Sequence, residues 1–153
     1  MVLTGQIDSI PAERLDILLL IEEDDVAPYE AAMNADFPNG TVCITIPPGE
    51  PMTKPRALNY GLAAALGEYV TVLDAEDRPH PDQLREAYET FCREGEDVRC
   101  VRAPLIASNG ADGWLQAQWS LEYAVQFGLH VPALASLSLP VMLGGTSNHF
   151  RRH

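Results

Sequence analysis

Apolar and polar positions alternate in blocks along this chain, and the blocks predict strands that take turns with helices. LDILLLI, residues 15–21, is a nearly continuous apolar run, which is typical of a buried strand in a parallel sheet. TVCITI, residues 41–46, is rich in β-branched residues and predicts a second strand. Shorter apolar runs at residues 69–73 and 98–103 predict a third and a fourth strand.

Helical patterns fill the intervals between these strands. Pro28, Pro55 and Pro81 each open one predicted helix, because proline is favoured at the first helical position. Gly67 and Gly95 follow the last apolar positions of two of these helices, where glycine commonly ends a helix. Strands that alternate with helices indicate an α/β fold, with a mostly parallel sheet and helices on both faces.

The longest predicted helix runs from Trp114 to about His130 and carries Leu115, Trp119, Tyr123 and Phe127 every four residues. Such an aromatic stripe is most often a face packed on the core. It also suits docking to a partner helix or a membrane surface, and these alternatives stay open.

Length and charge narrow the class of protein. The chain has 153 residues, 46% of them hydrophobic and 21% charged, which is enough for one globular domain with a core. Its formal net charge of −12 argues against sequence-independent nucleic-acid binding, which needs a basic face, and against attachment to anionic lipid. We interpret most of the acidity as a contribution to solubility.

The three cysteines, Cys43, Cys92 and Cys100, are far apart and lack C-x-x-C spacing. Neither a zinc site nor a disulfide framework is indicated, so each cysteine is expected to be a small core residue in a reducing compartment. The first nine residues do not have the pattern of a signal peptide, and no apolar run approaches the ~20 residues of a spanning helix.

Carboxylates directly follow the third predicted strand, at Asp74, Glu76 and Asp77. In open α/β folds ligands bind at the C-terminal edge of the sheet. Oxygen ligands there suit a hard divalent cation, which in turn suits a phosphate-bearing substrate. The alternative is a solvated acidic turn that favours the N-terminus of the next helix.

Three segments resemble the family-2 glycosyltransferases of GT-A fold, most closely the membrane-associated, polysaccharide-synthase-like branch. They are KPRALNYGLAAALGEYVTVLDAEDRPHPDQL, LDILLLIEEDD and LGGTSNHFRR, and with their spacing they cover most of the chain. The resemblance implies an inverting hexosyltransferase of polysaccharide biosynthesis. It would move a sugar from a nucleotide diphosphate sugar, a UDP-sugar in particular, to a carbohydrate or lipid-linked acceptor.

The resemblance also implies a metal site. The family's Asp-x-Asp motif corresponds to Asp74 and Glu76, with Asp77 beside them, so this chain reads Asp-x-Glu. Glutamate is still an oxygen ligand, and Mg²⁺ or Mn²⁺ would suit the set.

Further residues are expected around the donor. Glu23 and Asp24, beyond the first predicted strand, would contact the nucleoside, unless that strand simply ends in a solvated acidic loop. Lys54 would reach a phosphate as a point charge, or be an exposed cation before a helix. Asn59 is disfavoured inside a helix, so a specific hydrogen bond is expected, to the donor or to the turn before Asp74. Asp74 completes the nucleotide-sugar set.

On the acceptor side the expected residues are Gly145, Thr146 and Ser147, whose alternative is a plain turn into a last strand. His149 and Arg151 would either meet the acceptor or be surface residues.

Relative to the family, the chain looks like a single partial domain over residues 1–153, without the first strand, the general-base motif and the membrane helices. We therefore assign no catalytic residue and expect the isolated chain to be inactive in sugar transfer. We expect it in the cytoplasm, with the full-length form at the inner face of the membrane through the missing segments. An exposed sheet edge predicts a homo-oligomer.

Two other classes of function compete with this interpretation. One is a non-catalytic nucleotide-sugar or metal-binding module, or an interaction fragment, that needs a partner chain. The other is a nucleotidyltransferase, which would need a Gly-rich basic loop after the first strand, and the sequence has none there.

Overall fold

The structure is a computed structural model that describes residues 15–35, 37–38 and 40–152. Helices and strands alternate along most of this part of the chain, as the hydrophobic pattern predicts. The elements are β1 (Ile17–Glu22), α1 (Val26–Asn34), β2 (Thr41–Ile46), α2 (Lys54–Ala64), β3 (Tyr69–Val72), α3 (Gln83–Glu94), β4 (Cys100–Arg102), α4 (Trp114–Val125), the π-helical segment η2 (Gln126–His130), α5 (Val131–Ser136) and β5 (Asn148–Arg151).

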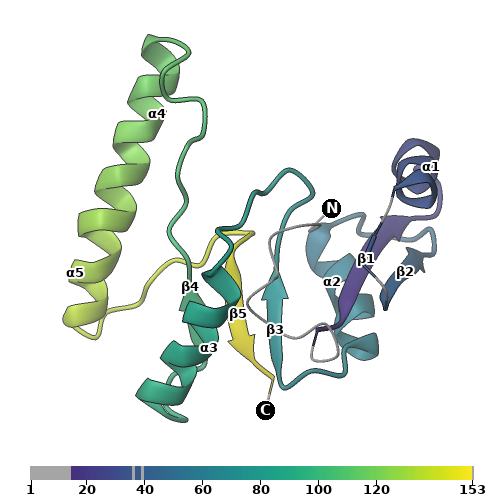
Figure 1. The fold of residues 1–153 in the computed structure, drawn as a ribbon, viewed down its shortest axis with the longest axis horizontal. Coiled ribbons are helices and arrows are strands. Elements are labelled where there is room, and N and C mark those ends of the chain that lie inside the picture. The colour runs from purple at the N-terminus through teal and green to yellow at the C-terminus, as the bar shows by residue number, and fades with distance from the viewer. Residues whose placement is uncertain (1–14, 36, 39, 153) are drawn as a thin grey trace.

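The strands of the described residues form two sheets, which stand side by side in Figure 1. β1 and β2 pair in parallel, with Ile17 opposite Thr41 and Glu22 opposite Ile46. The second sheet has the order β3-β5-β4, and β5 runs antiparallel to both of its neighbours. The α/β class is therefore confirmed, and β5 adds an antiparallel strand whose direction the hydrophobic pattern did not reveal.

Helix boundaries follow the predicted signals to within a few residues. α1 begins at Val26, two residues before Pro28, and α3 begins two residues after Pro81. Gly95 ends α3 with a φ of +77°, a conformation that glycine adopts without strain, so this prediction is confirmed. α2 ends at Ala64, before Gly67 is reached.

Two clusters of apolar side chains form the core. Around the first sheet, Ile17, Leu19, Ile21 and Ile46 are buried, and α2 lies against Leu20 through Gly61. A Cβ on Gly61 would come within 2.9 Å of Leu20 Cδ1, so a larger residue at position 61 would require the Leu20 side chain to shift.

The second cluster lies between α3 and the second sheet. Phe91 is 1% exposed, and its ring lies 4.9 Å from that of Tyr69 on β3. Ala87, one turn earlier on the same face of α3, is also buried.

The cysteines do not follow the expectation of buried core positions. Cys43 on β2 and Cys92 on α3 are exposed, and Cys100 on β4 is only half-buried. The prediction is wrong for the first two, because the apolar pattern of a strand or helix does not tell which of its faces a single small residue occupies.

α4, η2 and α5 continue one another as a helical arm, residues 114–136, which stands beside the second sheet in Figure 1. None of the three segments has a buried residue. Leu115 and Trp119 are 50% and 52% exposed, so their interpretation as a core face is wrong. No helix in the described ranges combines the length and hydropathy needed to cross a membrane.

His149 of β5 is buried and the Arg151 side chain is only 12% exposed, which overturns their interpretation as surface residues. The Arg151 guanidinium donates to the carbonyl oxygens of Phe91, at 3.3 Å, and Gly95, at 3.2 Å, at the end of α3. It also lies over the Tyr69 ring. A cation at these last carbonyls stabilises the C-terminus of the helix and ties α3 to the sheet.

His149, 2% exposed, connects three elements. Its Nδ1 lies 2.8 Å from Thr71 Oγ1 on β3, and its Nε2 lies 3.3 Å from Gln83 Nε2 on α3. Because the Gln83 amide nitrogen can only donate, Nε2 accepts and the Nδ1–H of the neutral ring donates to Thr71. Burial lowers the pKa of His149 to about 4, since the charged ring would lose its hydration.

We expect the free energy of unfolding to fall as the pH drops from about 6.5 to about 4. In this pH window the unfolded chain binds a proton at His149 that the folded chain does not bind. The full contribution of His149 to stability is therefore present only above the window. The loss is on the order of 3 kcal/mol. Urea unfolding across this pH range measures the loss. His149→Gln should flatten the dependence of the unfolding free energy on pH, whereas His130→Gln, at an exposed position, should not. Equal slopes in all three proteins would contradict the assignment.

Candidate functional site

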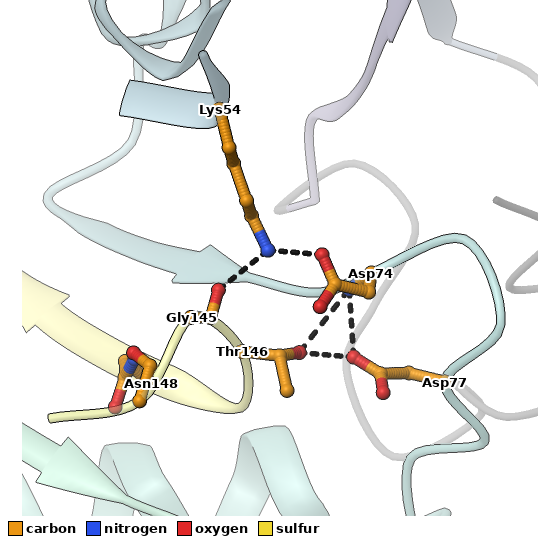
Figure 2. A network of polar contacts seen from close by, with 7 residues as sticks. Lys54, Asp74, Asp77, Gly145, Thr146 and Asn148 are labelled. Atoms are coloured by element: carbon orange, nitrogen blue, oxygen red, sulfur yellow. Dashed lines mark hydrogen bonds and ion pairs between the residues drawn. The ribbon is translucent and has the colours of Figure 1, made fainter.

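The candidate site forms where the end of β3 meets the start of β5. Because these strands pair antiparallel, the residues that follow β3 lie beside those that precede β5. The Ser147 N–H donates to the Val72 carbonyl at 2.8 Å, just beyond the last strand pair. This pairing brings the acidic turn at residues 74–77 against Gly145 and Thr146 (Figure 2).

The acidic turn is held by hydrogen bonds to itself and to Thr146. The Asp77 N–H donates to the Asp74 carbonyl at 3.1 Å, and the Asp74 N–H donates to Asp77 Oδ2 at 2.7 Å. The Thr146 hydroxyl accepts from the same Asp74 N–H at 3.1 Å and donates to Asp77 Oδ2 (Figure 2). Asp77 and Thr146 therefore fix the backbone from which the Asp74 side chain extends.

Lys54, the first residue of α2, brings a third segment to the site. Its ammonium donates to Asp74 Oδ1 and to the Gly145 carbonyl at 2.5 Å (Figure 2). The Lys54 and Asp74 side chains are 35% and 34% exposed, so the ion pair is accessible to solvent. The structure thus brings together Lys54, Asp74, Gly145 and Thr146, which the sequence predicted as separate donor and acceptor groups.

The other predicted acids are exposed. Glu76, on the acidic turn, makes no hydrogen bond or ion pair with another described residue. Glu23 and Asp24 are exposed after β1, whereas Glu22, which was not selected, pairs with Arg56 of α2 at 3.3 Å. β1 and β3 end toward the same side of the molecule in Figure 1, which is the relation that the predicted nucleoside contact requires.

Asn59 does not make the structural hydrogen bond that was the alternative to a contact with the donor. It is exposed on α2, and its side chain has no hydrogen-bond partner among the described residues, neither in the turn before Asp74 nor elsewhere. The helix therefore tolerates this asparagine without a structural partner.

Ser147 differs from the plain turn that was its alternative. It is 5% exposed and has a φ of +55°, which is uncommon for a residue other than glycine, asparagine or aspartate. Its carbonyl accepts from the Ala103 N–H at 3.0 Å, so backbone bonds to both neighbouring strands hold the strained conformation.

Sequence reasoning missed Asn148 and Arg102, which face each other in the strand register. Asn148, 3% exposed, donates to the Gly144 carbonyl at 2.6 Å, and its Oδ1 is buried without a partner among the described residues. Arg102 donates to the Met142 carbonyl at 2.6 Å. The Arg102 guanidinium lies close to Gly144, where a Cβ would come within 2.4 Å of Arg102 Nη2. No local signal marks Asn148, because its burial depends on a pairing distant in sequence.

The oxygen atoms at the site suit a hard cation and a phosphate. In the described part of the chain no three His, Cys, Asp or Glu side chains group closely enough to hold a metal ion by themselves. Asp74 and Glu76 offer two solvent-accessible carboxylates, and Mg²⁺ is commonly bound by one or two carboxylates together with phosphate oxygens and waters. The Lys54 ammonium adds positive charge at the same point.

Comparison with known proteins identifies one matching protein family. A family model described as Glycosyl transferase family 2 matches residues 23–141. No curated protein matches the chain. Three chains of solved structures match, among them one titled "Crystal Structure of a Mycobacterial Protein", with a TM-score of 0.45 and 21% identity over 90% of this chain. The alignment covers 43% of that structure's chain, so the present chain spans less than half of its length.

The hydrogen bonds of Thr146 yield a stability prediction. Thr146→Val keeps the shape of the side chain and leaves the Asp74 N–H and the Asp77 carboxylate each with one partner fewer, so we expect a loss of about 1–2 kcal/mol. Thr90→Val removes a solvent-exposed hydrogen bond from the hydroxyl to the Glu86 carbonyl one turn earlier on α3 and should cost less than about 0.5 kcal/mol. Urea unfolding of both variants compares them, and equal losses would show that Thr146 does not hold the turn.

Proposed function

Because the chain belongs to glycosyl transferase family 2, whose domain has the GT-A fold of nucleotide-diphospho-sugar transferases, we propose that it carries the donor-binding part of a sugar-transferring enzyme. The observation that carries the proposal is the convergence of Lys54, Asp74 and Thr146 from three segments of the chain. In the proposed reaction the acceptor hydroxyl loses its proton to a base and its oxygen forms a bond to the anomeric carbon, while the bond from that carbon to the diphosphate breaks and the nucleoside diphosphate leaves, with inversion.

Asp74 and Glu76 are the residues that we propose to hold Mg²⁺ or Mn²⁺. When bound, the cation would stabilise the negative charge on the departing diphosphate. Both carboxylates are accessible to solvent on one short turn, and the diphosphate oxygens and waters would complete the coordination. Asp77, also predicted as a ligand, contributes differently in this proposal, because its Oδ2 already accepts from Thr146 and from the Asp74 N–H. It holds the turn.

We propose that the positive charge of Lys54 interacts with the diphosphate of the donor. Its ammonium lies beside Asp74 and is about one-third exposed, so a phosphate oxygen can approach it from solvent. A lysine acts here as a point charge and needs no fixed orientation toward the phosphate. The same ammonium neutralises Asp74 when the donor is absent.

The remaining residues extend the proposal to both substrates. Glu23 and Asp24, exposed after the end of β1, would contact the nucleoside. Asn59 would form a hydrogen bond with the donor from the solvent-exposed side of α2. Gly145 would approach the acceptor through its backbone, while Thr146 and the buried Ser147 set the position of that backbone. We further propose a UDP-hexose as donor, and a carbohydrate or lipid-linked acceptor at the inner face of the membrane. The general base is not assigned to any described residue.

Titration with UDP tests the site. We expect calorimetry to detect UDP binding that strengthens when Mn²⁺ or Mg²⁺ is added, and Asp74→Asn to weaken the metal-dependent binding by about tenfold or more. Asp112→Asn is the matched control, because it removes one acidic charge from an exposed loop outside the site. GDP and dTDP, titrated in parallel, would identify the nucleoside.

Two results would count against this proposal. UDP binding of equal strength with and without the metal would remove the cation from the site. Metal-dependent binding that survives Asp74→Asn and Glu76→Gln would place the cation elsewhere in the chain.

A further inference from the structure

An open hollow lies on the helical arm, outside the contacts that join Lys54 to Asp74. The loop that follows β4 runs along the N-terminal half of α4 and borders with it a volume of about 350 Å³ that is open to solvent. This size is within the range of small-molecule sites. The lining residues are Ala107, Asn109, Leu115, Gln116, Trp119 and Tyr123.

The hollow carries no formal charge, although the protein has a net charge of −12. Residues 104–143 contain only two charged side chains, Asp112 and Glu122, and neither lines the hollow. Asn109 and Gln116 supply the polar part of the lining instead. Each amide offers both donors and acceptors, so the polar chemistry matches a neutral ligand with several hydroxyl groups.

The aromatic part of the lining is accessible and forms a corner. The rings of Trp119 and Tyr123 lie 6.1 Å apart at 87° to each other, and Trp119 is 52% exposed. A flat indole surface gains dispersion energy from the C–H groups on one face of a pyranose ring, while the hydroxyls at the rim of the sugar reach polar groups. An aromatic platform beside two amides therefore fits a saccharide better than it fits a purely apolar ligand.

The loop approaches the helix closely at Gly110. A Cβ on Gly110 would lie 2.1 Å from Ser120 Oγ and 3.0 Å from Ser120 Cβ on α4. The Asp112 N–H donates to the Asn109 carbonyl at 3.0 Å and closes the turn that carries Asn109. Glycine at position 110 is thus what allows the loop to approach α4 closely enough to form one wall of the hollow.

We propose that this hollow binds one sugar unit of a neutral oligosaccharide, with Trp119 as the stacking platform and Asn109 and Gln116 as hydrogen-bonding groups. As a subsite for the acceptor chain, the inference rests on the proposed transferase function. The binding itself requires neither the nucleotide nor a metal, so it can be tested separately.

The two tryptophans of the chain provide the test. Trp114 is 78% exposed on the same helix and does not line the hollow, so Trp114→Phe leaves Trp119 as the sole tryptophan reporter. We expect neutral hexasaccharides of glucose or N-acetylglucosamine to shift its fluorescence emission with a saturable dependence on concentration. In ligand-observed NMR, Trp119→Ala should weaken binding by about tenfold, while Trp114→Ala should not change it.

Circular dichroism and urea unfolding of each variant establish that it is folded. Gly110→Ala provides a second test of the hollow. It should weaken sugar binding by displacing the loop, while Trp119 remains in place. Absence of binding to every neutral hexasaccharide would overturn the inference. Equal losses in the Trp114→Ala and Trp119→Ala variants would also overturn it.

Two further outcomes assign the hollow to other occupants and overturn the inference as well. One is an emission shift that depends on protein concentration alone, together with a dimer in sedimentation velocity, which would indicate pairing of two helical arms. The other is tighter binding of a sulfated hexasaccharide than of its neutral counterpart. Asp74→Asn should leave oligosaccharide binding at the hollow unchanged. Failure of the proposed donor site in the UDP titration can therefore be distinguished from failure of the hollow to bind oligosaccharide.

Discussion

The ammonium of Lys54 joins parts of the molecule that the strand pairing keeps apart. It belongs to α2, which packs on the first sheet, and it bonds Asp74 and Gly145 of the second. A cation between a carboxylate and a carbonyl oxygen satisfies both at once, so the N-terminus of α2, the acidic turn and the segment before β5 meet at one point. The candidate donor site depends on this contact, because no other described lysine or arginine bonds the Asp74 carboxylate.

The sequence predicted well those features that depend on neighbours in the chain. The apolar runs located β1 to β4, the acids after β3 identified the polar end of that strand, and Gly95 marked the end of α3. It predicted poorly what depends on distant pairing. β5 enters between β3 and β4 and runs antiparallel to both, because the chain returns to the sheet only after the helical arm. Nothing in the four residues of the strand encodes that direction.

The candidate site shows the same difference between features that depend on local sequence and features that depend on distant pairing. Asp74, Lys54 and Thr146 were predicted from the acidic motif and from the resemblance, and the structure brings them together. Asn148, which is buried, and Arg151, whose side chain is 12% exposed, are polar residues of β5 whose low exposure no local pattern indicates. Arg151 is accommodated because the last carbonyls of α3 and two aromatic rings surround its guanidinium, and these partners lie more than fifty residues away in sequence.

The helical arm leaves the second sheet at β4 and returns to it at β5, which are adjacent strands. The two ends of this excursion are therefore held together by strand pairing, with Arg102 opposite Asn148. Since the cost of closing a longer loop grows only slowly with its length, the helical arm, residues 114–136, can change in length without disturbing the strands. The same scaffold can thus diversify in this one module, while Gly145 and Thr146, which lie after the arm and next to β5, keep their places beside Asp74.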